Sequence, residues 1–118
     1  MGNATGIIEY LQAGLRAAGL RQSVIANNIA NLDTPGYRRS TVAFETCLAE
    51  ALASSTPADL SRIEPRIIQP LATPVKANGN DVNLDAEVGE LIKNTGTYKL
   101  YLRLLDKVYS QMEMAIRG

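Results

Sequence analysis

Two long stretches of this chain, one near each end, repeat apolar residues at alternating steps of three and four. The first runs from Ile8 to Leu32 and is interrupted only by the polar Gln22, and the second runs from Val88 to Ile116 with unbroken spacing. This spacing places one apolar stripe along an α-helix and is typical of a coiled-coil seam. Two comparable stripes in 118 residues predict that the terminal helices pair with each other.

Each predicted helix also carries a second row of apolar or small residues beside its seam. The row on the first helix includes Tyr10, Leu20 and Val24, and the row on the second includes Leu100 and Leu104. Together the two helices present more apolar surface than a two-helix hairpin can bury. We therefore expect the chain to complete its fold by packing against copies of itself or close relatives.

Four prolines interrupt residues 53–82, between the two helices: Pro57, Pro65, Pro70 and Pro74. Proline at this density excludes a continuous helix and breaks any central strand. Extended structure is predicted only around residues 66–69 and 73–76. Ahead of this segment, apolar residues four apart predict a short amphipathic helix: Phe44, Leu48 and Leu52.

The predicted fold class is therefore mainly α. Two long terminal helices form an antiparallel coiled-coil hairpin, and the Pro-rich middle between them is partly extended or disordered. In this division, residues 1–33 are the N-terminal core helix and residues 83–118 are the C-terminal core helix. Residues 34–82 contain the turn, the short helix and the flexible middle segment.

The first helix is predicted to end at a tight turn of four residues: Thr34, Pro35, Gly36 and Tyr37. Proline sets the backbone at the second turn position, and glycine can adopt the positive φ that a type II turn requires at the third. Three asparagines precede this turn although Asn is a poor helix former: Asn27, Asn28 and Asn31. Arg38 and Arg39 follow it. We interpret them as a solvated pair rather than an anion site, because two positive charges alone are a weak signal for anion binding.

The second helix follows an alternation of acidic and amide side chains at Asp81, Asn83 and Asp85. This alternation looks like the start of a calcium-binding loop, but Ala86 and Ile92 stand where such a loop requires glycine and glutamate. A helix N-terminus is the better interpretation. Either Asn83 or Asp85 would cap the helix, and Glu87 would interact favourably with its dipole.

The composition argues against catalysis, metal binding and nucleic-acid binding. Twelve Lys and Arg residues balance twelve Asp and Glu residues, histidine is absent, and the single cysteine, Cys47, is interpreted as a packing residue. No apolar run has the length of a membrane span, and the N-terminal residues lack the pattern of a secretory signal. We expect no enzyme activity, no cofactor, no metal, no nucleic-acid partner and no direct membrane insertion.

The residues around the turn resemble a known signature. Residues 26–31, with the sequence Ala-Asn-Asn-Ile-Ala-Asn, the turn at residues 34–37 and Arg38 resemble the N-terminal motif of the flagellar rod and hook proteins. The C-terminal half narrows the resemblance to the members that form the proximal rod. The matching positions there are Asn80, residues 82–85, Glu87, Glu90, Leu91, Lys93, Asn94, Tyr98 and residues 115–118.

This resemblance implies a structural subunit of the bacterial flagellar basal-body rod, the tube that transmits torque from motor to hook. It implies export by the flagellar type III apparatus without a cleaved signal peptide, and a place in the periplasmic rod. The implied partners are copies of this chain, other rod and basal-body proteins, and the export apparatus. A soluble helical hairpin that binds a single partner helix as an adaptor is the alternative function.

The resemblance also implies that the terminal helices form the assembly interface. The expected interface residues are Leu11, Leu15, Ile25, Asn27, Asn28, Ile29, Asn31, Leu91, Tyr98, Leu102, Leu105 and Tyr109. The three asparagines are expected to hydrogen-bond to neighbouring chain segments where the helix leaves the core of the tube. On this interpretation, Asn28→Ala weakens assembly and barely changes the free chain.

Overall fold

The computed structural model of the chain describes residues 2–53 and 62–118. The elements of this part are α1 (Gly2–Ala30), β1 (Thr41–Ala43), α2 (Glu45–Ala53), β2 (Arg66–Ile68) and α3 (Leu84–Arg117). The predicted mainly α fold, with long helices at both ends and extended segments between them, is confirmed. The predictions for Pro57 and its neighbours fall on residues 54–61 and lie outside the described residues.

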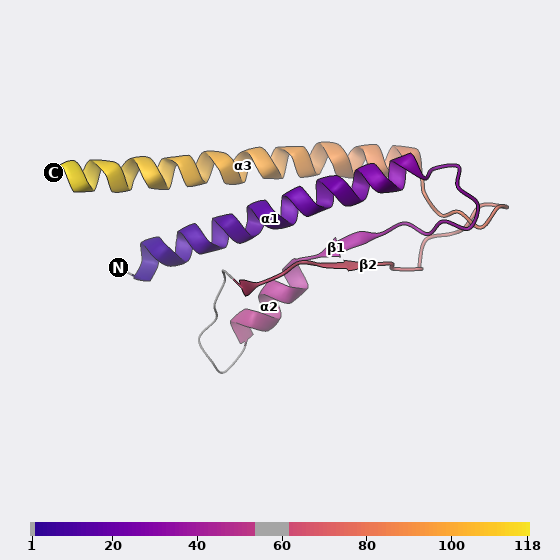
Figure 1. Cartoon of the computed structure of the whole chain (residues 1–118), viewed down its shortest axis with the longest axis horizontal. Helices are drawn as coiled ribbons and strands as arrows, with labels where there is room; N and C mark the ends of the chain where they lie inside the picture. Colours follow the sequence, from indigo (N-terminus) through magenta and orange to yellow (C-terminus); the bar gives the residue numbers. More distant parts are fainter. Residues whose placement is uncertain (1, 54–61) are drawn as a thin grey trace.

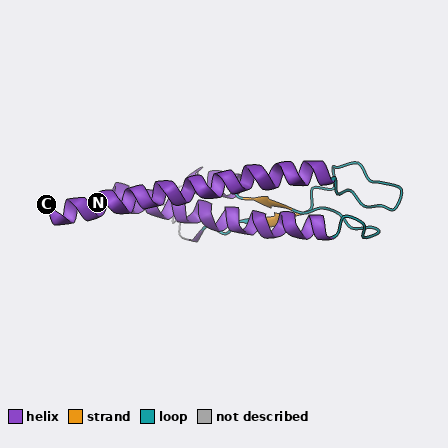
Figure 2. Cartoon of the chain, turned by 90° about the horizontal axis from the view of Figure 1, so that it is seen from above, coloured by secondary structure: helices purple, strands orange, loops and turns teal. Residues whose placement is uncertain are grey.

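The two long helices, α1 and α3, lie side by side along the long axis, and both chain ends lie at the same end of the molecule (Figure 1). The connecting loops gather at the other end, as the view from above shows (Figure 2). Residues later in α1 contact residues earlier in α3, as three pairs show: Gly14 with Tyr101, Ala18 with Asn94, and Asn28 with Glu87.

On the side away from α3, α1 packs against its own chain. The second row of α1 enters a buried cluster with residues that follow the turn: Ala13, Ala17, Val24, Val42, Phe44 and Ile63. Figure 1 shows the strands and α2 on this side of α1. The middle segment thus folds back and buries most of this row, although Tyr10 stays 39% exposed. The second neighbour that this row of α1 requires is therefore mainly its own chain.

The short elements of the middle segment follow the predicted pattern. α2 carries Cys47, which packs against the buried cluster and so confirms its interpretation as a packing residue. β1 and β2 form an antiparallel pair in which Val42 lies opposite Ile67. The predicted extended structure near residue 66 is confirmed, and the side chains of β2 are exposed.

The tight turn after α1 also forms as predicted. Gly36 has φ 73°, and the Tyr37 N–H donates to the Thr34 carbonyl at 3.2 Å. α1 itself ends at Ala30, before the end of the apolar pattern at Leu32. The reason is local: the Leu32 N–H donates to the carbonyl three residues earlier, at 3.1 Å, and this tighter, 3₁₀-type hydrogen bond ends the α-helix.

Of the two candidate caps, Asn83 and Asp85, it is Asn83 that begins α3. The side-chain oxygen Oδ1 of Asn83 accepts from the Ala86 N–H at 3.0 Å, with φ −112° and ψ 116° at Asn83, so this residue caps the helix and Asp85 lies in the first turn. The helix then continues through Thr95, Gly96 and Thr97 to Arg117 without a break.

We expect Asn83→Ala to lower the free energy of unfolding by about 1 kcal/mol, because it removes the cap. Asp85→Ala is the matched control. It leaves the cap in place and should lower stability by only about 0.3–0.5 kcal/mol through the helix dipole. Urea unfolding of the two variants measures both effects, and a larger loss for Asp85→Ala would contradict the assignment of the cap.

Candidate functional site

A cluster of polar side chains joins the end of α1 to the turn and to the start of α3. We call this cluster the polar clamp, and its members are Asn28, Tyr37, Arg38, Arg39, Asn80, Asp81 and Glu87. They come from segments that are 40 to 60 residues apart in the sequence. Four of them, Asn28, Asn80, Asp81 and Glu87, are buried.

The side chain of Asn28 lies at the centre of the clamp and is fully buried. Its amide nitrogen donates to the Ser40 carbonyl at 2.9 Å and to Glu87 Oε1 at 3.0 Å. Its oxygen accepts from the Ser40 N–H and from the Tyr37 hydroxyl, each at 3.0 Å. A primary amide has two donors and two acceptor sites, so Asn28 uses its whole hydrogen-bonding capacity inside the chain.

The two arginines after the turn bind buried carboxylates. Arg38 Nε lies 3.0 Å from Asp81 Oδ2, and Arg39 Nε lies 2.9 Å from Glu87 Oε1. The arginine side chains are only 27% and 21% exposed. The interpretation of Arg38 and Arg39 as a solvated pair is therefore wrong, because each guanidinium compensates an acid that would be costly to bury alone.

Asp81 is held in its charged form. Burial by itself would raise the pKa of Asp81, but the Arg39 N–H donates to Oδ1 at 2.6 Å and the Arg38 guanidinium donates to Oδ2. These hydrogen bonds and the two positive charges outweigh burial and hold the pKa of Asp81 below its usual value.

Asn80 fixes the turn against the segment that leads into α3. Its amide nitrogen donates to the carbonyls of Asn31 and Thr34, at 2.9 and 2.8 Å, and its oxygen accepts from the Val82 N–H. The Gly36 N–H adds a bond to the Asn78 carbonyl at 2.9 Å. The turn motif is thus held by the second half of the chain, and Asn80 satisfies a carbonyl just past the end of α1.

A second polar contact joins α1 and α3 away from the clamp. Asn94 is buried and donates to the Ala18 carbonyl at 2.8 Å and to Gln22 Oε1 at 3.0 Å. Among the described residues, Glu87 and Asn94 are the only buried side chains of α3. Polar groups therefore anchor this helix, while most of its large apolar side chains stay partly or largely exposed.

The predicted interface residues are distributed over several surfaces. Leu11 and Ile25 are buried, and Leu15, Ile29, Leu91 and Leu105 are half-buried. Three predicted residues of α3 are exposed, with accessible fractions of 39–46%: Tyr98, Leu102 and Tyr109. The role of these residues in assembly stays a prediction.

The predicted asparagines and turn residues lie together. Asn27 donates to the Tyr37 hydroxyl at 3.0 Å, and Asn31 binds the Asn27 carbonyl and accepts from the Thr34 hydroxyl. Pro35 and Gly36 are exposed at the tip of the turn. The expectation that Asn28→Ala barely changes the free chain is wrong, because the partners of Asn28 belong to its own chain.

Sequence reasoning missed the roles of Asn80, Asp81, Glu87 and Asn94. The sequence predicts only a favourable interaction of Glu87 with the helix dipole, whereas its Oε1 accepts hydrogen bonds from Asn28 and Arg39 in a buried site. One signal was present: Glu87, Asn94 and Tyr101 are seven residues apart and so lie on one face of a helix. All three contact α1.

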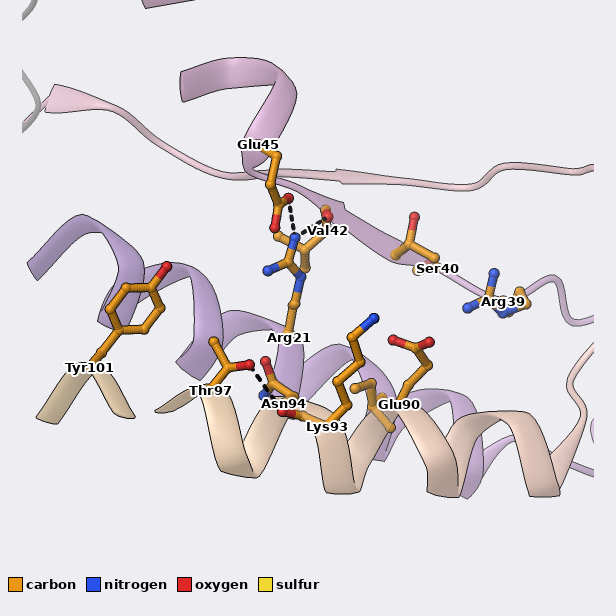
Figure 3. A pocket seen from close by; sticks show the side chains of 12 residues that line it. Arg21, Arg39, Ser40, Val42, Glu45, Glu90, Lys93, Asn94, Thr97 and Tyr101 are labelled. Carbon is orange, nitrogen blue, oxygen red and sulfur yellow. Dashed lines mark hydrogen bonds and ion pairs between the residues drawn. The ribbon is translucent and has the colours of Figure 1, made fainter. Parts of the chain in front are cut away.

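A cavity of about 310 Å³ opens beside the clamp, between α1, β1 and α3 (Figure 3). Its lining is mostly polar, and across it Arg21 donates to Glu45 and to the Val42 carbonyl. Burial would raise the pKa of Glu45, but the hydrogen bond and charge of Arg21 lower it. The ion pair of Arg21 and Glu45 thus joins α1 to α2 across this cavity.

The described residues offer no cluster of three or more His, Cys, Asp or Glu side chains that could hold a metal ion. None of the helices in the same part of the chain is long and apolar enough to span a membrane.

Comparisons with known proteins agree on one family. A family model for "Flagella basal body rod protein" matches residues 8–38, which hold most of α1 and the turn. The flagellar basal body rod protein FlgB of Borrelia hermsii is 31% identical over 121 residues, covering 87% of this chain and 90% of that protein. FlgB of Bacillus subtilis is 30% identical over 123 residues, covering 97% and 95%, and FlgB of Borreliella burgdorferi is 28% identical over 129 residues, covering 93% and 95%.

We expect Asn28→Ala to destabilise the free chain by about 3 kcal/mol, because it leaves the Ser40 backbone and Glu87 buried with fewer partners. Asn27→Ala is the control: Asn27 is exposed and makes one side-chain donation, so its loss should lower stability by less than about 1 kcal/mol. Urea unfolding gives both values. Equal losses in the two variants would contradict the central role of Asn28.

The lowered pKa of Asp81 gives the chain a dependence on pH. Because the folded pKa lies below the unfolded value of about 3.9, the group stabilises the fold above that pH, and this stabilisation disappears as the pH falls through the folded pKa. Asp81→Asn should therefore unfold more easily than the parent at pH 7, and the difference should shrink below about pH 4. Asp85→Asn, at an exposed position, is the control and should differ from the parent by no more than the about 0.3–0.5 kcal/mol of the helix dipole at any pH. A constant difference between Asp81→Asn and the parent across this range would contradict the assignment.

Proposed function

This chain belongs to the FlgB family of flagellar basal body rod proteins, and we propose that its two terminal helices build it into the rod. As a member of this family it is a structural subunit of the basal body rod. The proposal concerns how it performs that role: α1 and α3 act as an antiparallel coiled-coil hairpin that the polar clamp closes at one end. The opposite progression of contacts along the two helices supports this arrangement.

The surface of α3 is the observation that carries the proposal. Many of its large apolar residues are 38–83% exposed: Leu84, Val88, Ile92, Tyr98, Leu100, Leu102, Leu104, Tyr109, Met112, Met114 and Ile116. They lie on several sides of the helix, so a single contact with α1 does not cover them. This much exposed apolar surface on one helix supports a role as an interaction site.

The association that follows is open-ended. α1 is enclosed between α3 and the middle segment of its own chain, whereas α3 meets α1 on one side only. A copy that packs on α3 therefore contacts a different surface from the one through which α3 meets its own α1. The proposal is that the copy uses a surface other than its own α3, because such heterologous contacts generate rings or helical tubes, whereas an α3-to-α3 contact would close a two-fold dimer.

We further propose that the coiled-coil hairpin carries the torque load between neighbouring rod subunits, and that the partners are copies of this chain and other rod proteins. Delivery by the flagellar type III export apparatus to the periplasmic rod belongs to the same proposal, and family membership supports it. A one-to-one adaptor is the competing function, and it predicts saturation at one partner instead of continued growth.

Leu102→Asp is the sharpest test of the proposed interface. Leu102 is 44% exposed, so the free chain should keep its helix content and melting temperature, while assembly and swimming are lost because a charge is placed in an apolar contact. Ser110→Asp, at an exposed polar position of the same helix, should assemble and swim normally. Wild-type swimming of the Leu102→Asp strain would contradict the proposal.

A further inference from the structure

The anchoring of α3 to α1 is uneven along the helix. The buried side chains of α3, Glu87 and Asn94, both belong to its first third, and every residue from 111 to 118 is exposed. Beyond Asn94, the contact with α1 depends on a few half-buried side chains and on one long, exposed hydrogen bond from Gln12 to the Tyr109 hydroxyl, at 3.4 Å. Tyr101 is one of them, and it lies on the same face as Glu87 and Asn94, one heptad further along.

Tyr101 occupies a notch in α1 that exists because residue 14 is a glycine. A Cβ atom built on Gly14 would lie 2.5 Å from Cζ of Tyr101 and 2.6 and 2.8 Å from its two Cε atoms. These distances are far inside van der Waals contact, so the ring rests directly on the backbone of α1. The ring of Tyr10 closes one side of the notch, edge to face, with centroids 6.5 Å apart.

The segment between Asn94 and Tyr101 is the weakest part of the helix by propensity. It contains Thr95, Gly96 and Thr97, two β-branched residues around a glycine. Both threonine hydroxyls donate to carbonyls one turn earlier, a pattern that bends helices. Gly96 has no atom within 4 Å of its would-be Cβ, so packing does not stiffen this point.

We propose that Tyr101, seated against Gly14, is a positioning residue that sets the direction in which the distal part of α3, residues 98–117, leaves α1. The clamp and Asn94 hold the helix up to residue 94, and the Gly14 notch holds it again past the weak segment. Without the notch, the distal part of α3 moves about residues 95–97 while the proximal part stays docked.

A second consequence rests on the proposed function. The distal part of α3 carries many of the exposed apolar residues proposed for assembly, among them Leu102, Tyr109 and Met112. Their position relative to α1 therefore depends on Tyr101. A subunit with a released distal helix keeps its apolar surface but presents it in the wrong direction.

The main experiment compares Gly14→Ala with Gly19→Ala in the purified full chain, by hydrogen exchange. Both changes raise the helix propensity of α1, and a Cβ at Gly19 meets nothing within 4 Å, so Gly19→Ala should slow exchange or leave it unchanged. Gly14→Ala should instead speed exchange of amides 98–117 by about tenfold, a moderate overpacking effect, and leave amides 84–94 unchanged. The proposal is wrong if Gly14→Ala behaves like Gly19→Ala or speeds exchange equally along the whole of α3.

A double-mutant cycle tests the contact itself and does not require Gly14→Ala to stay fully folded. Tyr101→Ala should loosen the same distal amides by emptying the notch, and adding Gly14→Ala to it should cause no further loosening, because no ring remains to clash. Tyr101→Phe keeps the ring and should exchange like the parent. Additive effects of Gly14→Ala and Tyr101→Ala would overturn the proposed contact.

Swimming then separates the positioning role from the rod function. Gly14→Ala should impair swimming, and Tyr101→Phe and Gly19→Ala should not. If Gly14→Ala loosens the distal helix but the cells swim normally, the positioning role in assembly is wrong and the rod function is unaffected. If none of the variants, including Leu102→Asp, affects swimming, the proposed assembly surface itself is wrong.

Discussion

The arrangement of this chain depends on the buried amide of Asn28. Its two donors and two acceptor sites are distributed over α1's neighbours: the Ser40 backbone, the Tyr37 hydroxyl and the Glu87 carboxylate. A buried amide is tolerated only when its partners are in place, so the turn, the start of β1 and the start of α3 must meet around one side chain. Hydrogen bonds are directional, and this contact therefore fixes a single register for α3 on α1.

The side chains that α3 buries are polar, whereas many of its large apolar side chains are exposed. In most globular folds a helix buries apolar residues against its own chain and exposes polar ones. α3 instead buries Glu87 and Asn94 against α1 and leaves large apolar residues such as Leu100 and Ile92 in contact with solvent. The arrangement suits the proposed assembly, because directional polar contacts hold the helix in place and leave the non-directional apolar surface exposed.

Much of the fold could be predicted because it follows from local rules. The three-four spacing located both long helices, the Pro35-Gly36 pair located the turn, and the need for a cap reduced the start of α3 to Asn83 or Asp85. Each of these depends on residues that lie within a few positions of one another. The family signature added the function, since it spans the same residues as the end of α1 and the turn.

The candidate site could be predicted only in part, because its contacts are distant in sequence. Asp81 lies 43 residues from Arg38, and Glu87 lies 59 residues from Asn28. A solvated arginine pair and a dipole-stabilising glutamate were equally good local interpretations of the same residues. Periodicity predicted that the two long helices pair, but it took the apolar seam of α3 as the contact face and ignored Glu87 and Asn94, because these polar residues lie outside that seam.

The exposed strand β2 has a consequence for a protein that we propose to associate through its helices. Its side chains face solvent and include Ile67 and Ile68, so it is the kind of edge on which chains aggregate. Pro65 and Pro70 stand on either side of it, and proline donates no N–H to a growing ladder. The strand is thereby limited to three residues. The flanking prolines thus disfavour sheet extension, which would favour the proposed helical packing of subunits over fibrous aggregation at high concentration.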